Sequence, residues 1–110
     1  MAVEHLTKEN FEETVKSSEL PIIVDFWAGW CGPCMMFGPV FEALSGEYDG
    51  QVRFAKVNVD EERAVAAAFG ITGIPTMILM HKGKEAGRFS GALPREAFKQ
   101  KLDSMLSALE

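Results

Sequence analysis

The chain has 110 residues, of which 47% are hydrophobic and 25% are charged, so it is long enough for one globular domain and too apolar to be disordered. Its 11 Lys and Arg residues and 16 Asp and Glu residues give a net charge of −5. An acidic surface repels phosphates and anionic headgroups, so neither nucleic acid nor a membrane is expected as a partner. We expect residues 1–110 to form a single domain.

The N-terminal residues show no basic segment followed by an apolar one, and no later apolar run is long enough to span a bilayer. If the chain is complete, these patterns predict a cytoplasmic protein. Cytosolic thiols are kept reduced, and a chain of this size does not need a disulfide to hold it together. We therefore expect its two cysteines to be reactive.

The first part of the chain predicts two helices separated by a strand. A first helix is expected to have Thr7 as its cap and to bury Phe11 and Val15. Residues 22–28 form an apolar run rich in β-branched and aromatic side chains, which predicts a central strand covered on both faces. A second helix is expected to open with the cysteine motif at residues 30–34. Its buried face is predicted to carry Phe37, Val40, Phe41 and Leu44.

The second part predicts three strands and a short helix. Residues 52–59 form a second buried strand, and residues 61–69 form an Ala-rich helix. A third apolar strand covers residues 76–80. A turn at residues 82–84 then leads into a shorter strand at residues 85–90, so these last two strands are expected to form an antiparallel hairpin.

A final helix is expected to begin at Pro94. Its apolar stripe consists of Phe98, Leu102, Met105, Leu106 and Leu109. The order of these elements predicts an α/β fold, with a central mixed β-sheet of about four to five strands flanked by four helices on its two faces.

Both cysteines lie in the segment Trp30-Cys31-Gly32-Pro33-Cys34. Two thiols at this spacing can close a small disulfide reversibly, which transfers two electrons. Unpaired N–H groups and the dipole at a helix start favour the thiolate of Cys31. Pro33 needs no N–H in a first turn, and Gly32 leaves the approach to Cys31 free of a side chain. We expect Cys31 to be an exposed attacking thiol and Cys34 to be the more buried resolving thiol.

A metal site is the competing use of this motif. Zinc usually takes four thiolate or imidazole ligands, and a single CxxC supplies two. The two histidines, His5 and His81, are expected at a frayed N-terminus and at the end of a strand. We therefore expect redox chemistry and no metal ion.

An acidic residue, Asp25, lies inside the apolar run of residues 22–28. Burial of a carboxylate is costly and raises its pKa. The side chain either reaches solvent at the end of the strand or is buried for a functional reason. We favour the second interpretation, because isolated buried acids often mark functional sites.

Motifs along essentially the whole chain resemble the thioredoxin family, and together they are far more specific than the CxxC spacing. They are Asp25-Phe26-Trp27-Ala28, Trp30-Cys31-Gly32-Pro33-Cys34, Pro39, Val57-Asn58-Val59-Asp60, Gly73-Ile74-Pro75-Thr76 and Gly91-Ala92. The resemblance implies the thioredoxin fold and a protein-disulfide reductase. In that reaction Cys31 attacks a substrate disulfide and Cys34 resolves the mixed disulfide.

The resemblance also implies roles for residues outside the motif. Asp25 would be the proton acceptor behind Cys34, with Lys56 as its charge partner. Pro75 would follow a cis peptide bond, and the backbone of Ile74 would pair with an extended substrate segment. The implied substrate-binding surface consists of Trp30, Gly32, Pro33, Ile74, Pro75, Gly91 and Ala92. Trp27 is expected to pack in the core.

By the same resemblance, the partners are disulfide-containing proteins and a thioredoxin reductase that uses NADPH and FAD. The chain has no dinucleotide-binding glycine fingerprint, so both cofactors would belong to the reductase, and the Cys31–Cys34 disulfide would be the only redox group of this chain. A monomer is expected.

Three points remain open. Met35 stands where the family often has Lys, and its effect on the thiolate and on partner choice is undecided. A thioredoxin-fold oxidase or isomerase is an alternative, although Gly32-Pro33 favours a reductant. A binding or regulatory subunit, whose reduced face matters more than turnover, is the alternative from another class.

Overall fold

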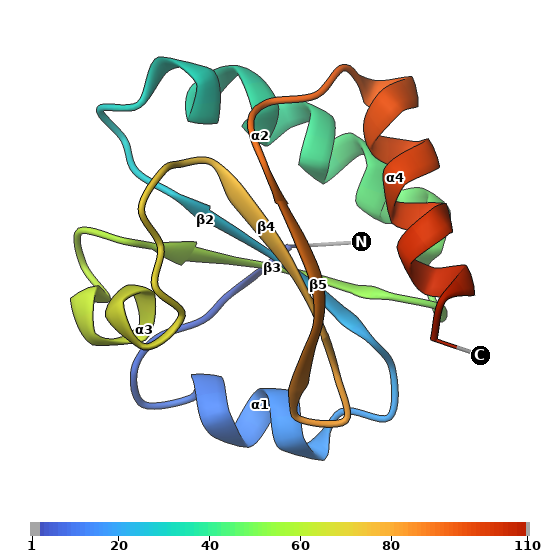
Figure 1. Ribbon diagram of the computed structural model, residues 1–110, viewed down its shortest axis with the longest axis horizontal. Coiled ribbons are helices and arrows are strands. Elements are labelled where there is room, and N and C mark those ends of the chain that lie inside the picture. Colours follow the sequence, from blue (N-terminus) through green and yellow to red (C-terminus); the bar gives the residue numbers. More distant parts are fainter. Residues whose placement is uncertain (1–2, 110) are drawn as a thin grey trace.

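The structure is a computed structural model that describes residues 3–109, and in this range one mixed five-stranded sheet lies between two layers of helices (Figure 1). The elements in chain order are β1 (Glu4–His5), α1 (Phe11–Ser17), β2 (Ile22–Trp27), α2 (Gly32–Ser45), the 3₁₀-helix η1 (Gly46–Tyr48), β3 (Arg53–Asn58), α3 (Arg63–Ala68), β4 (Thr76–His81), β5 (Lys84–Ser90) and α4 (Arg95–Ser107). The predicted α/β fold is confirmed.

The sheet has the strand order β1-β3-β2-β4-β5. Strand β2 pairs in parallel with β3 and antiparallel with β4, and β4 and β5 form the expected antiparallel hairpin. The two residues of the hairpin turn, Lys82 and Gly83, both have positive φ angles, of 54° and 79°. Such a turn matches the right-handed twist of its strands, which accounts for the tight connection.

The central strand β2 divides the core in two. Ile23 packs in a cluster with residues of α2 and α4, whereas Ile22, Val24 and Phe26 pack in a second cluster with residues of α1 and α3. Figure 1 shows these helix pairs on opposite sides of the sheet. Because successive side chains of a strand point to opposite faces, Asp25 belongs to the face that α2 and α4 cover.

Helix α2 is held in place by an aromatic cluster around Phe98 of α4. The ring of Phe98 lies 5.0 Å from Phe37 and 5.8 Å from Phe41, centroid to centroid, so the two helices pack directly together. Phe98 and Leu102 of the predicted stripe are fully buried, and Met105, Leu106 and Leu109 are partly buried. This packing fixes the helix that begins at the cysteines.

Two details at the N-terminal end differ from the prediction. The short strand β1 was not expected, and it places His5 on the edge of the sheet beside β3. Helix α1 begins at Phe11 with Asn10, and not Thr7, as its N-cap residue. The Thr7 carbonyl accepts hydrogen bonds from the N–H groups of Asn10 and Phe11, and the Thr7 N–H donates a hydrogen bond of 2.7 Å to Asn10 Oδ1. Thr7 thus closes a turn before the helix. No helix within residues 3–109 is long and apolar enough to cross a membrane.

Candidate active site

Cys31 and Cys34 form a disulfide at the start of α2. Cys31 is the N-cap residue, and its sulfur accepts a hydrogen bond of 3.2 Å from the N–H of Cys34. Pro33 lies in the first turn, where the missing N–H costs nothing. The helix start therefore directs a backbone donor at the Cys31 sulfur, which is the environment that favours a thiolate.

Both cysteines are buried in this oxidised form, with 5% of Cys31 and 2% of Cys34 accessible. The expectation of an exposed Cys31 is wrong for the residue as a whole, since its sulfur is bonded to Cys34 and lies 3.7 Å from the carbonyl oxygen of Ile74. The order of the two exposures is the expected one, and the difference is small.

The loop before β4 lies against the disulfide. The peptide bond between Ile74 and Pro75 is cis, as the family resemblance implied. The Pro75 carbonyl accepts a hydrogen bond of 2.8 Å from the N–H of Gly91, whose φ of 100° suits glycine. Thr76 Oγ1 lies 2.9 Å from Ser90 Oγ. These bonds tie the end of β5 to the loop that faces Cys31.

Trp30, the residue before Cys31, lies on the surface. Its side chain is 71% exposed, and its indole Nε1 donates a hydrogen bond of 2.9 Å to Asp60 Oδ2. Trp30 and Ile74 line one groove with a volume of about 310 Å³. Of the other residues expected on this surface, the structure exposes Gly32, Pro33, Gly91 and Ala92 and buries Pro75.

Asp25 is fully buried in the middle of β2. Neither carboxylate oxygen has a hydrogen-bond partner within residues 3–109. Desolvation raises the pKa of Asp25 from 3.8 to about 7, and the positive charge of Lys56 opposes part of that rise. The alternative of a strand-end side chain that reaches solvent is therefore excluded.

Lys56 lies opposite Asp25 in the parallel register of β2 and β3. Its ammonium group is 4.5 Å from the centroid of the Trp27 ring, and a Cβ atom added at Gly38 of α2 would lie 3.6 Å from the same nitrogen. Lys56 thus occupies the space between the sheet and α2. Trp27, expected in the core, is half-buried at the end of its strand.

Asp60 is a contact of the site to which the sequence analysis assigned no role. It lies just after β3, where the Asn58 side chain accepts a hydrogen bond of 2.9 Å from the N–H of Asp60. Parallel strands end at the same edge of a sheet, so residues after β2 and after β3 come together there. The position of Asp60 directly after a buried strand is therefore the signal in the sequence that could have placed it near Trp30.

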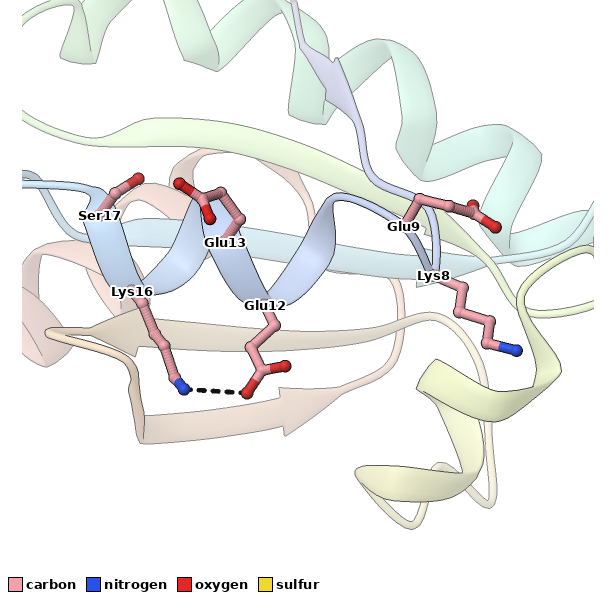
Figure 2. A pocket seen from close by; sticks show the side chains of 6 residues that line it. All are labelled: Lys8, Glu9, Glu12, Glu13, Lys16 and Ser17. Atoms are coloured by element: carbon pink, nitrogen blue, oxygen red, sulfur yellow. Dashed lines mark ion pairs between the residues drawn. The ribbon is translucent and has the colours of Figure 1, made fainter.

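A larger open hollow of about 650 Å³ lies along α1, on the sheet face opposite α2 (Figure 2). It is lined by Lys8, Glu9, Glu12, Glu13, Lys16 and Ser17. Glu12 and Lys16 form an exposed ion pair of 2.9 Å across one helical turn. These side chains are exposed to solvent, and the hollow contains neither cysteine. Within residues 3–109 no three His, Cys, Asp or Glu side chains are grouped as a metal site would require.

A disulfide between cysteines three residues apart at a helix start, in contact with a cis-proline loop, is the arrangement of a dithiol–disulfide oxidoreductase. The family model described as Thioredoxin matches residues 2–104. Over 97 residues the chain is 47% identical to Thioredoxin 2 of Chlorobaculum tepidum, covering 88% of this chain and 89% of that protein.

Two further relatives agree with this assignment. The thioredoxin of Chlorobaculum thiosulfatiphilum is 45% identical over 97 residues, which are 88% of this chain and 90% of the relative. The thioredoxin of Haemophilus influenzae is 44% identical over 91 residues, which are 83% and 85% of the two chains. The chain therefore belongs to the thioredoxin family, and it is a thioredoxin-type disulfide reductase.

Proposed function

We propose that Cys31 is the attacking thiolate of this reductase and that Cys34 is its resolving thiol. The thiolate of Cys31 attacks one sulfur of a substrate disulfide, that S–S bond breaks, and the first substrate thiolate leaves. Cys34 then loses its proton and attacks the sulfur of Cys31. The mixed disulfide breaks and the second substrate thiolate leaves, and the two electrons gained by the substrate come from the two cysteine thiols, which are oxidised to the Cys31–Cys34 disulfide.

One observation carries this assignment: the Cys31 sulfur accepts the Cys34 N–H at 3.2 Å and lies 3.7 Å from the Ile74 carbonyl oxygen. The first contact stabilises a negative charge on Cys31. The second brings the same sulfur to the edge of the loop where a substrate backbone can pair with Ile74.

Asp25 accepts the proton of Cys34 in this proposal, directly or through water. Two observations support this role. Asp25 lies on the face of β2 that α2 covers, and its pKa of about 7 suits proton transfer near neutrality. Lys56 acts as a positioning residue, because its charge holds the pKa of Asp25 below the value that burial alone would give.

The substrate protein binds across the surface named from the sequence. Three observations support this surface: the contact of Ile74 with Cys31, the hydrogen bond between Gly91 and Pro75, and the groove shared by Trp30 and Ile74. Gly32, Pro33 and Ala92 extend it. A thioredoxin reductase that holds FAD and uses NADPH restores the dithiol, and the protein acts in the cytoplasm as a monomer with no cofactor of its own.

Insulin reduction with dithiothreitol tests the activity, and covalent trapping tests the two roles. Cys34→Ser is expected to accumulate a mixed disulfide through Cys31, whereas Cys31→Ser is expected to trap nothing and to lose turnover. If Cys31→Ser is the variant that traps substrate, the two roles are reversed. If Cys31→Ser keeps full function in cells, a binding subunit is the better description.

A further inference from the structure

A second apolar groove lies between α2 and the segment after β5. It has a volume of about 230 Å³, and it is lined by Met36, Phe37, Val40, Ala92, Leu93 and Pro94. Met36 is 76% exposed, a high value for a large apolar side chain. The groove thus leaves apolar surface in water at the border between α2 and the segment after β5.

This groove continues the proposed substrate surface. Ala92 belongs to both, and Pro33, Met36 and Val40 follow one another along one side of α2 at spacings of three and four residues. The segments that form this second groove and the cysteine motif carry no charged side chain. Residues 26–41 and 89–94 contain no Asp, Glu, Lys, Arg or His at all.

We propose that this second groove, bounded by Met36, Val40 and Leu93, binds an apolar side chain next to the disulfide of the substrate protein, and that Met36 determines this preference. The inference rests on the proposed function and adds the class of substrate. The occupant is a substrate segment because the groove is continuous with the surface that faces Cys31, and it is apolar because no charged or hydrogen-bonding side chain lines the groove.

The position of Met36 makes it the adaptable wall of the groove. Phe37 is buried in the core, so it cannot move toward a ligand, whereas an unbranched and exposed methionine can fit side chains of different shape. The neighbouring Met35 is 53% exposed but does not line the groove. The chain therefore contains a matched control one residue away.

The test compares two disulfide-bridged peptides that are identical except for leucine or glutamine on both sides of their cysteines. The readout is the ratio of kcat/KM for the leucine peptide to that for the glutamine peptide. We expect the wild-type chain to favour the leucine peptide and Met36→Gln to lower the ratio about fivefold, which corresponds to about 1 kcal/mol. Met36→Leu and Met35→Gln are expected to keep the wild-type ratio.

An unchanged ratio in Met36→Gln, or an equal fall in Met35→Gln, would overturn the proposal. So would a concentration-dependent dimer of the wild-type chain that Met36→Gln abolishes, because a second copy would then cover the groove. Reduction of hydroxyethyl disulfide by the wild-type chain distinguishes failure of this proposal from failure of the proposed function. If this small disulfide is not reduced either, the proposed thiol chemistry is wrong, whatever the groove binds.

Discussion

Replacement of Asp25 by Asn is expected to stabilise the protein at neutral and alkaline pH and to leave its stability almost unchanged in acid. The side chain is fully buried and neither oxygen has a hydrogen-bond partner in the described residues. Asn has nearly the same shape and no charge. The difference between the two chains therefore reports the cost of the buried carboxylate.

The magnitude follows from the pKa of Asp25, which burial raises from 3.8 to about 7 while Lys56 limits the rise. Below pH 3.8 the carboxyl is protonated in both the folded and the unfolded chain, so it costs little. Between the two values the unfolded chain loses the proton that the folded chain keeps, and the free energy of unfolding falls as pH rises. Above about pH 7 the loss is complete, and at about 1.36 kcal/mol per pH unit it amounts to about 4 kcal/mol.

Urea unfolding of the oxidised chains, repeated from about pH 3 to about pH 8, measures this difference. Glu61→Gln, which neutralises an exposed acid, serves as the control and is expected to show no such trend. A difference between wild type and Asp25→Asn that stays constant across the series would refute the reasoning. A wild type more stable than Asp25→Asn at about pH 8 would refute it as well.

Three further changes test neighbouring parts of the site and core. Lys56→Met removes the charge that lowers the pKa of Asp25, so in the same urea series the pH-dependent loss of stability is expected to extend to higher pH; an unmoved upper end would contradict the coupling. Asp60→Ala removes the acceptor of the Trp30 indole N–H and is expected to lower kcat/KM for insulin about threefold with unchanged urea stability. Phe98→Ala leaves a cavity in the cluster between α2 and α4 and is expected to lower the free energy of unfolding in urea by about 3–5 kcal/mol. A decrease below about 1 kcal/mol would mean that the neighbouring side chains fill the cavity.

Most of the fold could be predicted because its strongest elements carry their pattern locally. The run at β2 is apolar on both faces, as a strand between two helix layers must be, and the turn at Lys82-Gly83 fixes the hairpin. Strand β1 could not be predicted this way. Its two residues are polar, and an ion pair of 2.6 Å between Glu4 and Arg53 of the adjacent strand accompanies the pairing.

Some features of the candidate site could also be predicted from the local sequence, and others could not. The helix start at Cys31 could be predicted from local sequence, and the apolar run around Asp25 favoured burial over a side chain that reaches solvent, which the structure bears out. The contact of Cys31 with Ile74 and the bond of Trp30 to Asp60 join segments that are 43 and 30 residues apart. Only the strand order brings these segments together, so hydrophobic patterning does not reveal them.

The buried acid Asp25 lowers the stability of the fold while it gives the candidate site a base. Its neighbours across the sheet include Met77, and an apolar side chain at Asp25 would complete the same cluster without a desolvation cost. Lys56 offsets only part of that cost, because the pKa of Asp25 still rises to about 7. A carboxyl with that pKa is a much stronger base than an exposed one, and near neutrality it can both take up and return a proton. The stability that the fold loses at Asp25 is therefore the cost of the proton acceptor that we propose for Cys34.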